Sequence, residues 1–130
     1  LLETDLLDIM LALEDGRLDE AKVRFRGGSC CCVVLASQGY PGAYETGFPI
    51  ELGGADEIKN VFVFHAGTRR EQDRLVTSGG RVLGVSALGA DAKAARSAAY
   101  AAAENIRFER AFYRSDIGSK AIAETEQGEN

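Results

Sequence analysis

A glycine-rich turn between two β-type runs is the feature that most constrains this fold. Residues 77–80 read Thr-Ser-Gly-Gly, and they separate a short apolar run at 75–77 from a longer one at 81–88. A Gly-Gly turn in this setting is typical of a tight hairpin, so we expect antiparallel strands joined by short loops. Arg81 leaves a second interpretation open. Its planar fork of donors suits a carboxylate or phosphate, and glycine N–H groups can face the same anion.

Hydrophobic periodicity predicts the other elements of the chain. Thr4 or Asp5 can cap an N-terminal helix that ends at Gly16. Asp91 can cap a long helix whose apolar face is made of alanines, and this helix runs to about Asn105. Further strands are expected at 22–26, 30–36, 61–65 and 106–113, with a short edge strand at 49–52, a loop at 37–47 and a final turn or short helix at 115–123.

These elements predict an α+β fold with a mainly antiparallel sheet and helices packed on one side. A chain of 130 residues is long enough to bury one core. Residues 1–16 are expected to form a helix continuing from a preceding domain, because the chain has no initial Met and opens directly in a helical pattern. Residues 17–123 then form the main domain, and the polar residues 124–130 form a frayed tail. The charged residues 68–74 are expected to join two strands as a solvated hairpin tip.

Charge and hydropathy argue against two classes of partner. The net charge of -5 would repel a polyanion, so nucleic acid is not expected as a partner. The longest apolar run, at residues 30–36, is too short to cross a bilayer, and no signal peptide is recognisable. We therefore expect a soluble, cytoplasmic protein without a membrane partner.

Three adjacent cysteines, Cys30, Cys31 and Cys32, lie in an apolar run that is typical of a buried strand. Neighbouring thiols on a strand point to opposite faces, so they cannot easily chelate one metal ion, and no second group of cysteines exists. Their odd number also gives no disulfide framework. The pattern favours core packing in a reducing compartment.

Residue types that serve in catalysis occur singly. His65 is the only histidine, and a lone histidine at a strand end is more often structural than a base. Arg114 and Asp116 are close enough in sequence to form a local ion pair that holds a turn. The residues themselves therefore predict no catalytic group and no metal ligand in this chain.

Several spaced blocks, taken together, resemble one family. They are residues 36–42 (Ala-Ser-Gln-Gly-Tyr-Pro-Gly), 64–68 (Phe-His-Ala-Gly-Thr), 77–85 (Thr-Ser-Gly-Gly-Arg-Val-Leu-Gly-Val) and 112–118 (Phe-Tyr-Arg-Ser-Asp-Ile-Gly). In this order they resemble the C-terminal region of the phosphoribosylamine–glycine ligase family, also called glycinamide ribonucleotide synthetases, within the ATP-grasp superfamily. The opening residues 1–7 resemble the segment just after the family's metal-binding carboxylates. The resemblance covers residues 1–123.

The resemblance implies an enzyme that uses ATP to join glycine to 5-phosphoribosylamine in purine biosynthesis, through a glycyl phosphate intermediate. ATP and Mg, with Mn as a possible substitute, are implied for the full-length enzyme. Both would bind N-terminal ATP-grasp domains that this chain lacks, so the chain alone is expected to be inactive. It would form the lid domain, whose loops face the acceptor substrate. The substrate-binding residues expected on this basis are Gly39, Tyr40, Pro41, His65, Gly67, Thr68, Ser78, Gly79, Gly80 and Arg81.

Three alternatives stay open at this point. The chain could be the lid of another ATP-grasp purine carboligase or carboxylase. It could also be a stand-alone module that binds an anionic metabolite, or a purely structural interaction domain. The Gly-Tyr-Pro block at residues 39–41 and the block at 112–118 favour the ligase.

Overall fold

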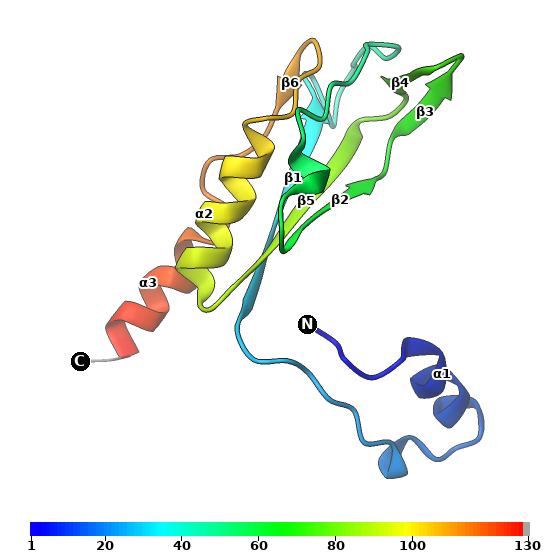
Figure 1. The fold of residues 1–130 in the computed structure, drawn as a ribbon, viewed down its shortest axis with the longest axis vertical. Coiled ribbons are helices and arrows are strands. Elements are labelled where there is room, and N and C mark those ends of the chain that lie inside the picture. The colour runs from blue at the N-terminus through cyan, green and yellow to red at the C-terminus, as the bar shows by residue number, and fades with distance from the viewer. Residues whose placement is uncertain (129–130) are drawn as a thin grey trace.

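The computed structural model describes residues 1–128 of the chain, and Figure 1 shows its helices and strands. In chain order the elements are α1 (Leu6–Glu14), the 3₁₀ turn η1 (Leu18–Glu20), β1 (Ser29–Ser37), the 3₁₀ turn η2 (Ala55–Glu57), β2 (Val61–His65), β3 (Thr68–Glu71), β4 (Arg74–Thr77), β5 (Arg81–Gly89), α2 (Ala92–Ala103), β6 (Ala111–Phe112) and α3 (Ser119–Gly128). The α+β prediction is confirmed.

Four strands form the main sheet in the order β2-β5-β1-β6, and β3 and β4 form a separate two-stranded sheet. Every pairing is antiparallel, as the short connections predicted. In the main sheet, Val33 of β1 lies opposite Val85 of β5, which lies opposite Val63 of β2. Because side chains alternate along a strand, this register places one row of apolar residues on a single face of the sheet.

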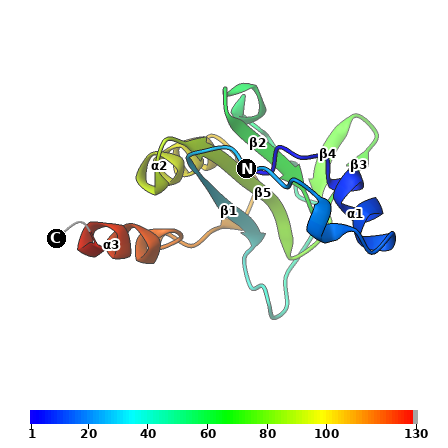
Figure 2. The same cartoon turned by 90° about the horizontal axis from the view of Figure 1, so that it is seen from below.

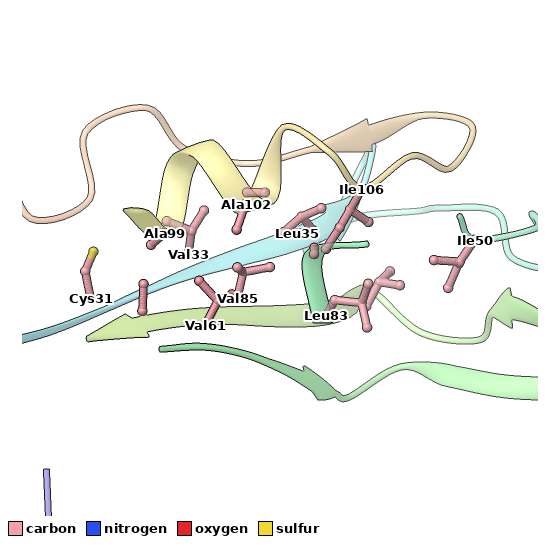
Figure 3. Close-up of a cluster of buried hydrophobic side chains, with 14 of the residues drawn as sticks. Cys31, Val33, Leu35, Ile50, Val61, Leu83, Val85, Ala99, Ala102 and Ile106 are labelled. Carbon is pink, nitrogen blue, oxygen red and sulfur yellow. The ribbon is translucent and has the colours of Figure 1, made fainter. Parts of the chain in front are cut away.

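Helix α2 covers that face, and the core lies between the helix and the sheet (Figure 3). Val33, Leu35 and Val85 are completely buried. The helix buries four alanines against them, Ala95, Ala99, Ala102 and Ala103. Their small side chains let the helix axis come close to the strands, and the predicted alanine face is confirmed for these four positions. The predicted cap is also confirmed, since the Asp91 carboxylate accepts a hydrogen bond of 2.7 Å from the Ala94 N–H.

The hairpin predicted around residues 77–80 is wrong. β4 pairs with β3, whereas β5 pairs with β1 and β2, so the chain passes from one sheet to the other at this turn. The Ser78 N–H donates to the Gly67 carbonyl at 2.8 Å, which ties the turn to the connection between β2 and β3 instead of closing it on its own flanks. Residues 68–74 are therefore not a simple connection. They form β3 and the turn into β4, and this exposed two-stranded sheet leaves their charged side chains in water.

Three further segments were expected as strands but make single bridges or a shorter strand. Residues 22–26 contribute only the bridge between Leu2 and Phe25, and residues 49–52 contribute bridges at Pro49 and Glu51. Residues 106–113 form only the two-residue strand β6. The tail expected to be frayed at residues 124–130 is helical as far as Gly128, where α3 ends. Residues 129–130 lie outside the described residues.

The three cysteines are free, but only one of them belongs to the core. Cys31 is buried on the face that α2 covers, whereas Cys30 and Cys32 are exposed on the opposite face. The core-packing interpretation is therefore wrong for Cys30 and Cys32, because alternation along β1 sends them to the face that no helix covers. Burial raises the pKa of the Cys31 thiol, and the neighbouring Cys32 adds to this effect.

Helix α1 begins and ends where the sequence predicted. The Asp5 carboxylate accepts a hydrogen bond of 2.8 Å from the Leu7 N–H, and Gly16 follows the helix with a φ of 68°. However, α1 buries none of its residues. In both views of the molecule the strands of the main sheet lie between α1 and α2 (Figures 1 and 2).

Candidate functional site

The candidate site lies at one end of the strands of the main sheet, where three loops meet. β1 and β2 both run antiparallel to the central strand β5, so they run in the same direction as each other. The ends of β1 and β2 and the start of β5 therefore lie at one edge. Three loops begin or end there, at residues 37–47, 66–67 and 78–80, and we call this edge the loop rim.

Backbone hydrogen bonds join the second and third loops of the loop rim. The Gly67 N–H donates to the Arg81 carbonyl at 2.8 Å, and the Ser78 N–H donates to the Gly67 carbonyl at the same distance. A Cβ atom on Gly67 would lie 2.5 Å from the Arg81 carbonyl oxygen and 2.7 Å from the Gly79 Cα. The two loops can approach this closely only because both Gly67 and Gly79 lack a side chain.

The loop after β1 is held against the same turn. The Ser37 N–H donates to the Gly80 carbonyl at 2.8 Å, and the Ser37 hydroxyl donates to the Gly79 carbonyl at 3.0 Å. The Tyr40 ring covers Gly80 so closely that a Cβ atom there would lie 2.1 Å from the ring Cδ2. Tyr44 packs edge-on against Tyr40 with a centroid distance of 6.1 Å. Aromatic side chains thus form one wall of the loop rim.

The turn at residues 78–80 keeps donors free for a ligand. Within residues 1–128, neither the Gly79 N–H nor the Gly80 N–H donates to a protein acceptor. The exposed Arg81 guanidinium likewise forms no ion pair or hydrogen bond with a described residue. Successive backbone N–H groups beside a guanidinium are a typical anion-binding arrangement. The chemistry available here is recognition of a carboxylate or phosphate.

His65 lies at the loop rim in a structural arrangement. Its Nδ1 is 3.1 Å from the Thr68 hydroxyl oxygen, so the two side chains share a hydrogen bond across the turn between β2 and β3. Both groups belong to the candidate residues predicted from the sequence. Among residues 1–128, no carboxylate or thiol forms a hydrogen bond with the imidazole. The arrangement thus holds the turn, as a lone histidine often does.

All ten residues expected to bind substrate lie on or beside these three loops. Tyr40 connects the first loop to Gly80, whereas Gly39 packs within its own loop, where a Cβ atom would lie 2.1 Å from the Ala43 carbonyl oxygen. Pro41 is exposed next to them. Sequence reasoning missed the importance of Ser37. The available signal was a polar residue at the end of the apolar run in β1, and the structure buries it almost completely, with 3% of its surface exposed.

The block at residues 112–118, which contains Arg114, has a structural role. The Arg114 guanidinium makes two hydrogen bonds, of 2.8 and 2.6 Å, to the Asp116 carboxylate, so the predicted local ion pair is confirmed. The Arg114 guanidinium lowers the pKa of the Asp116 carboxyl, chiefly through these hydrogen bonds. Two side chains of α2 hold this block, because Arg96 donates to the Ser115 and Ile117 carbonyls and the Tyr100 hydroxyl donates to the Arg114 carbonyl.

No group of three or more His, Cys, Asp or Glu side chains within residues 1–128 is arranged to hold a metal ion. Among the same residues, no helix has the length and apolar character needed to cross a bilayer.

Comparison with known proteins points to one family. The family described as "Phosphoribosylglycinamide synthetase, C domain" matches residues 30–120. The phosphoribosylamine–glycine ligase of Caulobacter vibrioides is 50% identical over 123 residues, which cover 93% of this chain and 29% of that protein. The ligase of Caldanaerobacter subterraneus subsp. tengcongensis is 46% identical over 119 residues, which cover 92% of this chain and 28% of that protein.

A solved structure is similar as well. The crystal structure of phosphoribosylamine–glycine ligase from Thermotoga maritima matches with a TM-score of 0.67 and 34% identity, over 83% of this chain and 27% of that chain. The chain thus spans less than a third of the length of the curated relatives that it matches.

Proposed function

This chain belongs to the phosphoribosylglycinamide synthetase C-domain family, and from that premise we propose that it is the C-terminal part of a phosphoribosylamine–glycine ligase. The parent enzyme joins glycine to 5-phosphoribosylamine with ATP and produces glycinamide ribonucleotide, ADP and phosphate in purine biosynthesis. A carboxylate is a poor electrophile until one of its oxygens becomes a phosphate leaving group, which explains the route through glycyl phosphate. Residues 1–16 continue from the preceding ATP-grasp domain, residues 17–123 form the lid domain, and the enzyme is cytoplasmic.

The loop rim is the part of this chain that contacts substrate. Its three loops meet where β1 and β2 end and β5 begins, and this single observation carries the proposal, because the turn that joins the loops contains the free N–H groups of Gly79 and Gly80 and is followed directly by Arg81. Together they bind the phosphate of the sugar or the carboxylate of glycine. Tyr40 and the turn at His65 and Thr68 shape the two sides of the rim.

ATP and Mg²⁺ are bound elsewhere in the parent enzyme. The residues of this chain orient the substrate, and the N-terminal ATP-grasp domains of the parent enzyme supply phosphoryl transfer.

A chimera tests the proposal. This chain replaces the 123 matching residues of the Caulobacter vibrioides ligase, and ADP release is measured with glycine and phosphoribosylamine. We expect ADP release by the chimera that depends on both substrates, and none above blank by the isolated chain. A correctly folded chimera without activity would contradict the proposal, as would turnover by the chain alone.

Substrate contact is tested by calorimetry with glycinamide ribonucleotide. Arg81→Ala in the chimera should weaken binding about 10–100-fold, because one charge-assisted hydrogen-bonding group contributes about 1.5–3 kcal/mol. Arg70→Ala removes an exposed arginine from β3, away from the loop rim, and is the matched control. Equal binding by both variants would remove Arg81 from the site.

Two alternatives are weaker. A carboxylase or another carboligase is not favoured, since the curated relatives carry the name of the glycine ligase. A stand-alone anion-binding module differs from the ligase domain in one measurable way. It would bind glycinamide ribonucleotide equally well as an isolated chain and within the chimera, whereas a lid domain needs the rest of the cleft.

A further inference from the structure

Ser37, the last residue of β1, is buried next to the turn at residues 78–80. Its N–H donates to the Gly80 carbonyl and its hydroxyl donates to the Gly79 carbonyl. Within residues 1–128, no other group donates a hydrogen bond to either of these two carbonyls. A single residue therefore fixes two successive carbonyl groups of the turn, and its burial limits competition from water.

The hydrogen bond from the Ser37 hydroxyl also sets the direction of a backbone donor. In a trans peptide unit the C=O and N–H bonds point in opposite directions, and the Gly79 carbonyl shares its trans unit with the Gly80 N–H. Because the hydroxyl binds that carbonyl, the Gly80 N–H points away from Ser37, and it has no acceptor among residues 1–128. The N–H group is thus available to a ligand at the loop rim.

Glycine on both sides gives this peptide unit an alternative orientation. Gly79 and Gly80 have no Cβ atom, so rotation about the two bonds that flank the unit meets little steric resistance. A flipped unit would place its carbonyl oxygen where the N–H group had been, and a carbonyl oxygen repels an anion. The flip would also break the 3.0 Å hydrogen bond from the Ser37 hydroxyl. This hydrogen bond therefore favours the orientation that can bind an anion.

A β-bulge places Ser37 where it can form these contacts. The pairing of β1 with β5 shifts by one residue after Leu35, so β5 contains one extra residue at this point. Without the shift Ser37 would lie opposite Arg81, whereas with it the Ser37 N–H reaches the Gly80 carbonyl. On its other side Ser37 pairs with Ala111 of β6, so its backbone is held from both edges. Bulges of this kind often redirect a residue beside a functional site.

We propose that Ser37 is a positioning residue for anion recognition at the loop rim, because its hydroxyl holds the peptide unit between Gly79 and Gly80 with the N–H group toward the ligand. This inference rests on the proposed function, in which the anion is the phosphate of the sugar or the carboxylate of glycine. Ser37 acts through Gly80 and not by contact with the substrate. The donors that meet the anion are backbone N–H groups and the Arg81 guanidinium.

Kinetics of the chimera with the Caulobacter vibrioides ligase separate positioning from stability. Ser37→Ala removes the hydroxyl that binds the Gly79 carbonyl. Thr77→Val is the matched control, because it removes a completely buried hydroxyl that accepts a hydrogen bond from the Phe48 N–H and forms none with Gly79 or Gly80. We expect both variants to lower the urea midpoint, since each loses one hydrogen bond.

Only the Ser37 variant should change substrate recognition. KM and kcat are measured for glycine and for phosphoribosylamine, each at saturation with the other. We expect Ser37→Ala to raise one KM about tenfold with kcat within twofold, because the hydrogen bond lost to a charged group is made equally before and during the reaction. Thr77→Val should leave both KM values within twofold. The substrate whose KM rises supplies the anion.

The outcomes for the positioning role and for the proposed function are distinct. An active chimera whose KM values are unchanged by Ser37→Ala overturns the positioning role and leaves the proposed function in place. The same holds if Ser37→Ala and Thr77→Val raise the same KM equally, because the effect is then one of stability alone. A folded but inactive unmodified chimera refutes the proposed function, and the positioning role is then decided by a second measurement.

That measurement is NMR spectroscopy of the isolated chain, which reports on the peptide unit without catalysis. Inorganic phosphate is titrated at constant ionic strength while the Gly80 amide resonance is followed. We expect phosphate to shift this resonance in the unmodified chain and in Thr77→Val, and Ser37→Ala to weaken the binding about tenfold. If Ser37→Ala fails to fold, Ser37→Cys replaces it, since a thiol is similar in size but a weak donor. An unmodified chain without a phosphate-dependent shift, or a Ser37 variant with the unmodified affinity, overturns the inference.

Discussion

Gly80→Ala tests the packing of the loop rim most directly. The new Cβ would lie 2.1 Å from Cδ2 and 2.7 Å from Cε2 of the Tyr40 ring, so the ring must move away. Tyr40 is 38% exposed and can turn into water without disturbing the backbone. It then loses its apolar contact with the turn, and we expect this partial loss of aromatic burial to cost about 1.5 kcal/mol of stability.

Two other glycine variants bracket this value. Gly67→Ala places its Cβ 2.5 Å from the Arg81 carbonyl oxygen, and that atom belongs to the backbone of β5 and cannot turn away. We expect about 3 kcal/mol of destabilisation for this variant. Gly27→Ala meets no atom within 4 Å, so it should change the free energy of unfolding by less than about 0.5 kcal/mol.

Urea unfolding followed by circular dichroism measures the three free energies, and a double-mutant cycle tests the cause. In a Tyr40→Ala background the space beside Gly80 is empty, so Gly80→Ala should have almost no further effect. The expected coupling energy between the two positions is about 1.5 kcal/mol. A Gly80→Ala variant that is harmless in the unmodified chain, or equally costly without the Tyr40 ring, would refute this description of the loop rim.

Three other predictions concern single contacts. Ser37→Ala leaves the Gly79 carbonyl without its hydroxyl donor and should lower the unfolding free energy by about 1 kcal/mol. An unchanged urea midpoint would mean that this hydrogen bond contributes nothing to stability. Ala99→Leu adds volume at a completely buried position of α2 and should lower the unfolding free energy by about 1–3 kcal/mol. Ala101→Leu, on the exposed side of the helix, is the control, and equal urea midpoints for the two variants would contradict the described packing. Because the folded pKa of Asp116 lies below its unfolded value of 3.8, its pairing with Arg114 stabilises the chain above that pH and is lost as the pH falls through the folded pKa. Asp116→Asn should remove this small acid-dependent loss of melting temperature, and identical melting profiles against pH would exclude the contribution.

Local sequence signals predicted most of the elements that form the core. The apolar runs of β1, β2 and β5 and the alanines of α2 lie in the elements that the sequence predicted, because a short apolar run bounded by turn residues and a helical spacing of alanines are both local signals. The cap at Asp91 was predictable for a similar reason, since it depends on a hydrogen bond to a residue only three positions away. Several spaced blocks in one order also predicted the family, which the family comparison confirms.

The pairing of β4 could not be predicted in this way. Its apolar run and the Gly-Gly turn after it fit a hairpin with β5, but β5 already has partners on both sides in β1 and β2. A strand can form backbone hydrogen bonds along only two edges, so β4 must pair with β3 instead. This competition involves residues far apart in the chain, which a local pattern does not contain.

Most helices and strands, the antiparallel class and the family follow from the amino-acid sequence, because these depend on local periodicity and on the order of short motifs. Which strand neighbours which, and which face of the sheet each residue occupies, depend on how distant segments assemble. The assembled sheet places Cys31 in the core and Cys30 and Cys32 on the opposite face, because α2 packs on only one face of the sheet. It also joins Ser37, Gly67 and Gly80 at one edge, because hydrogen bonds between distant segments depend on how the sheet is assembled.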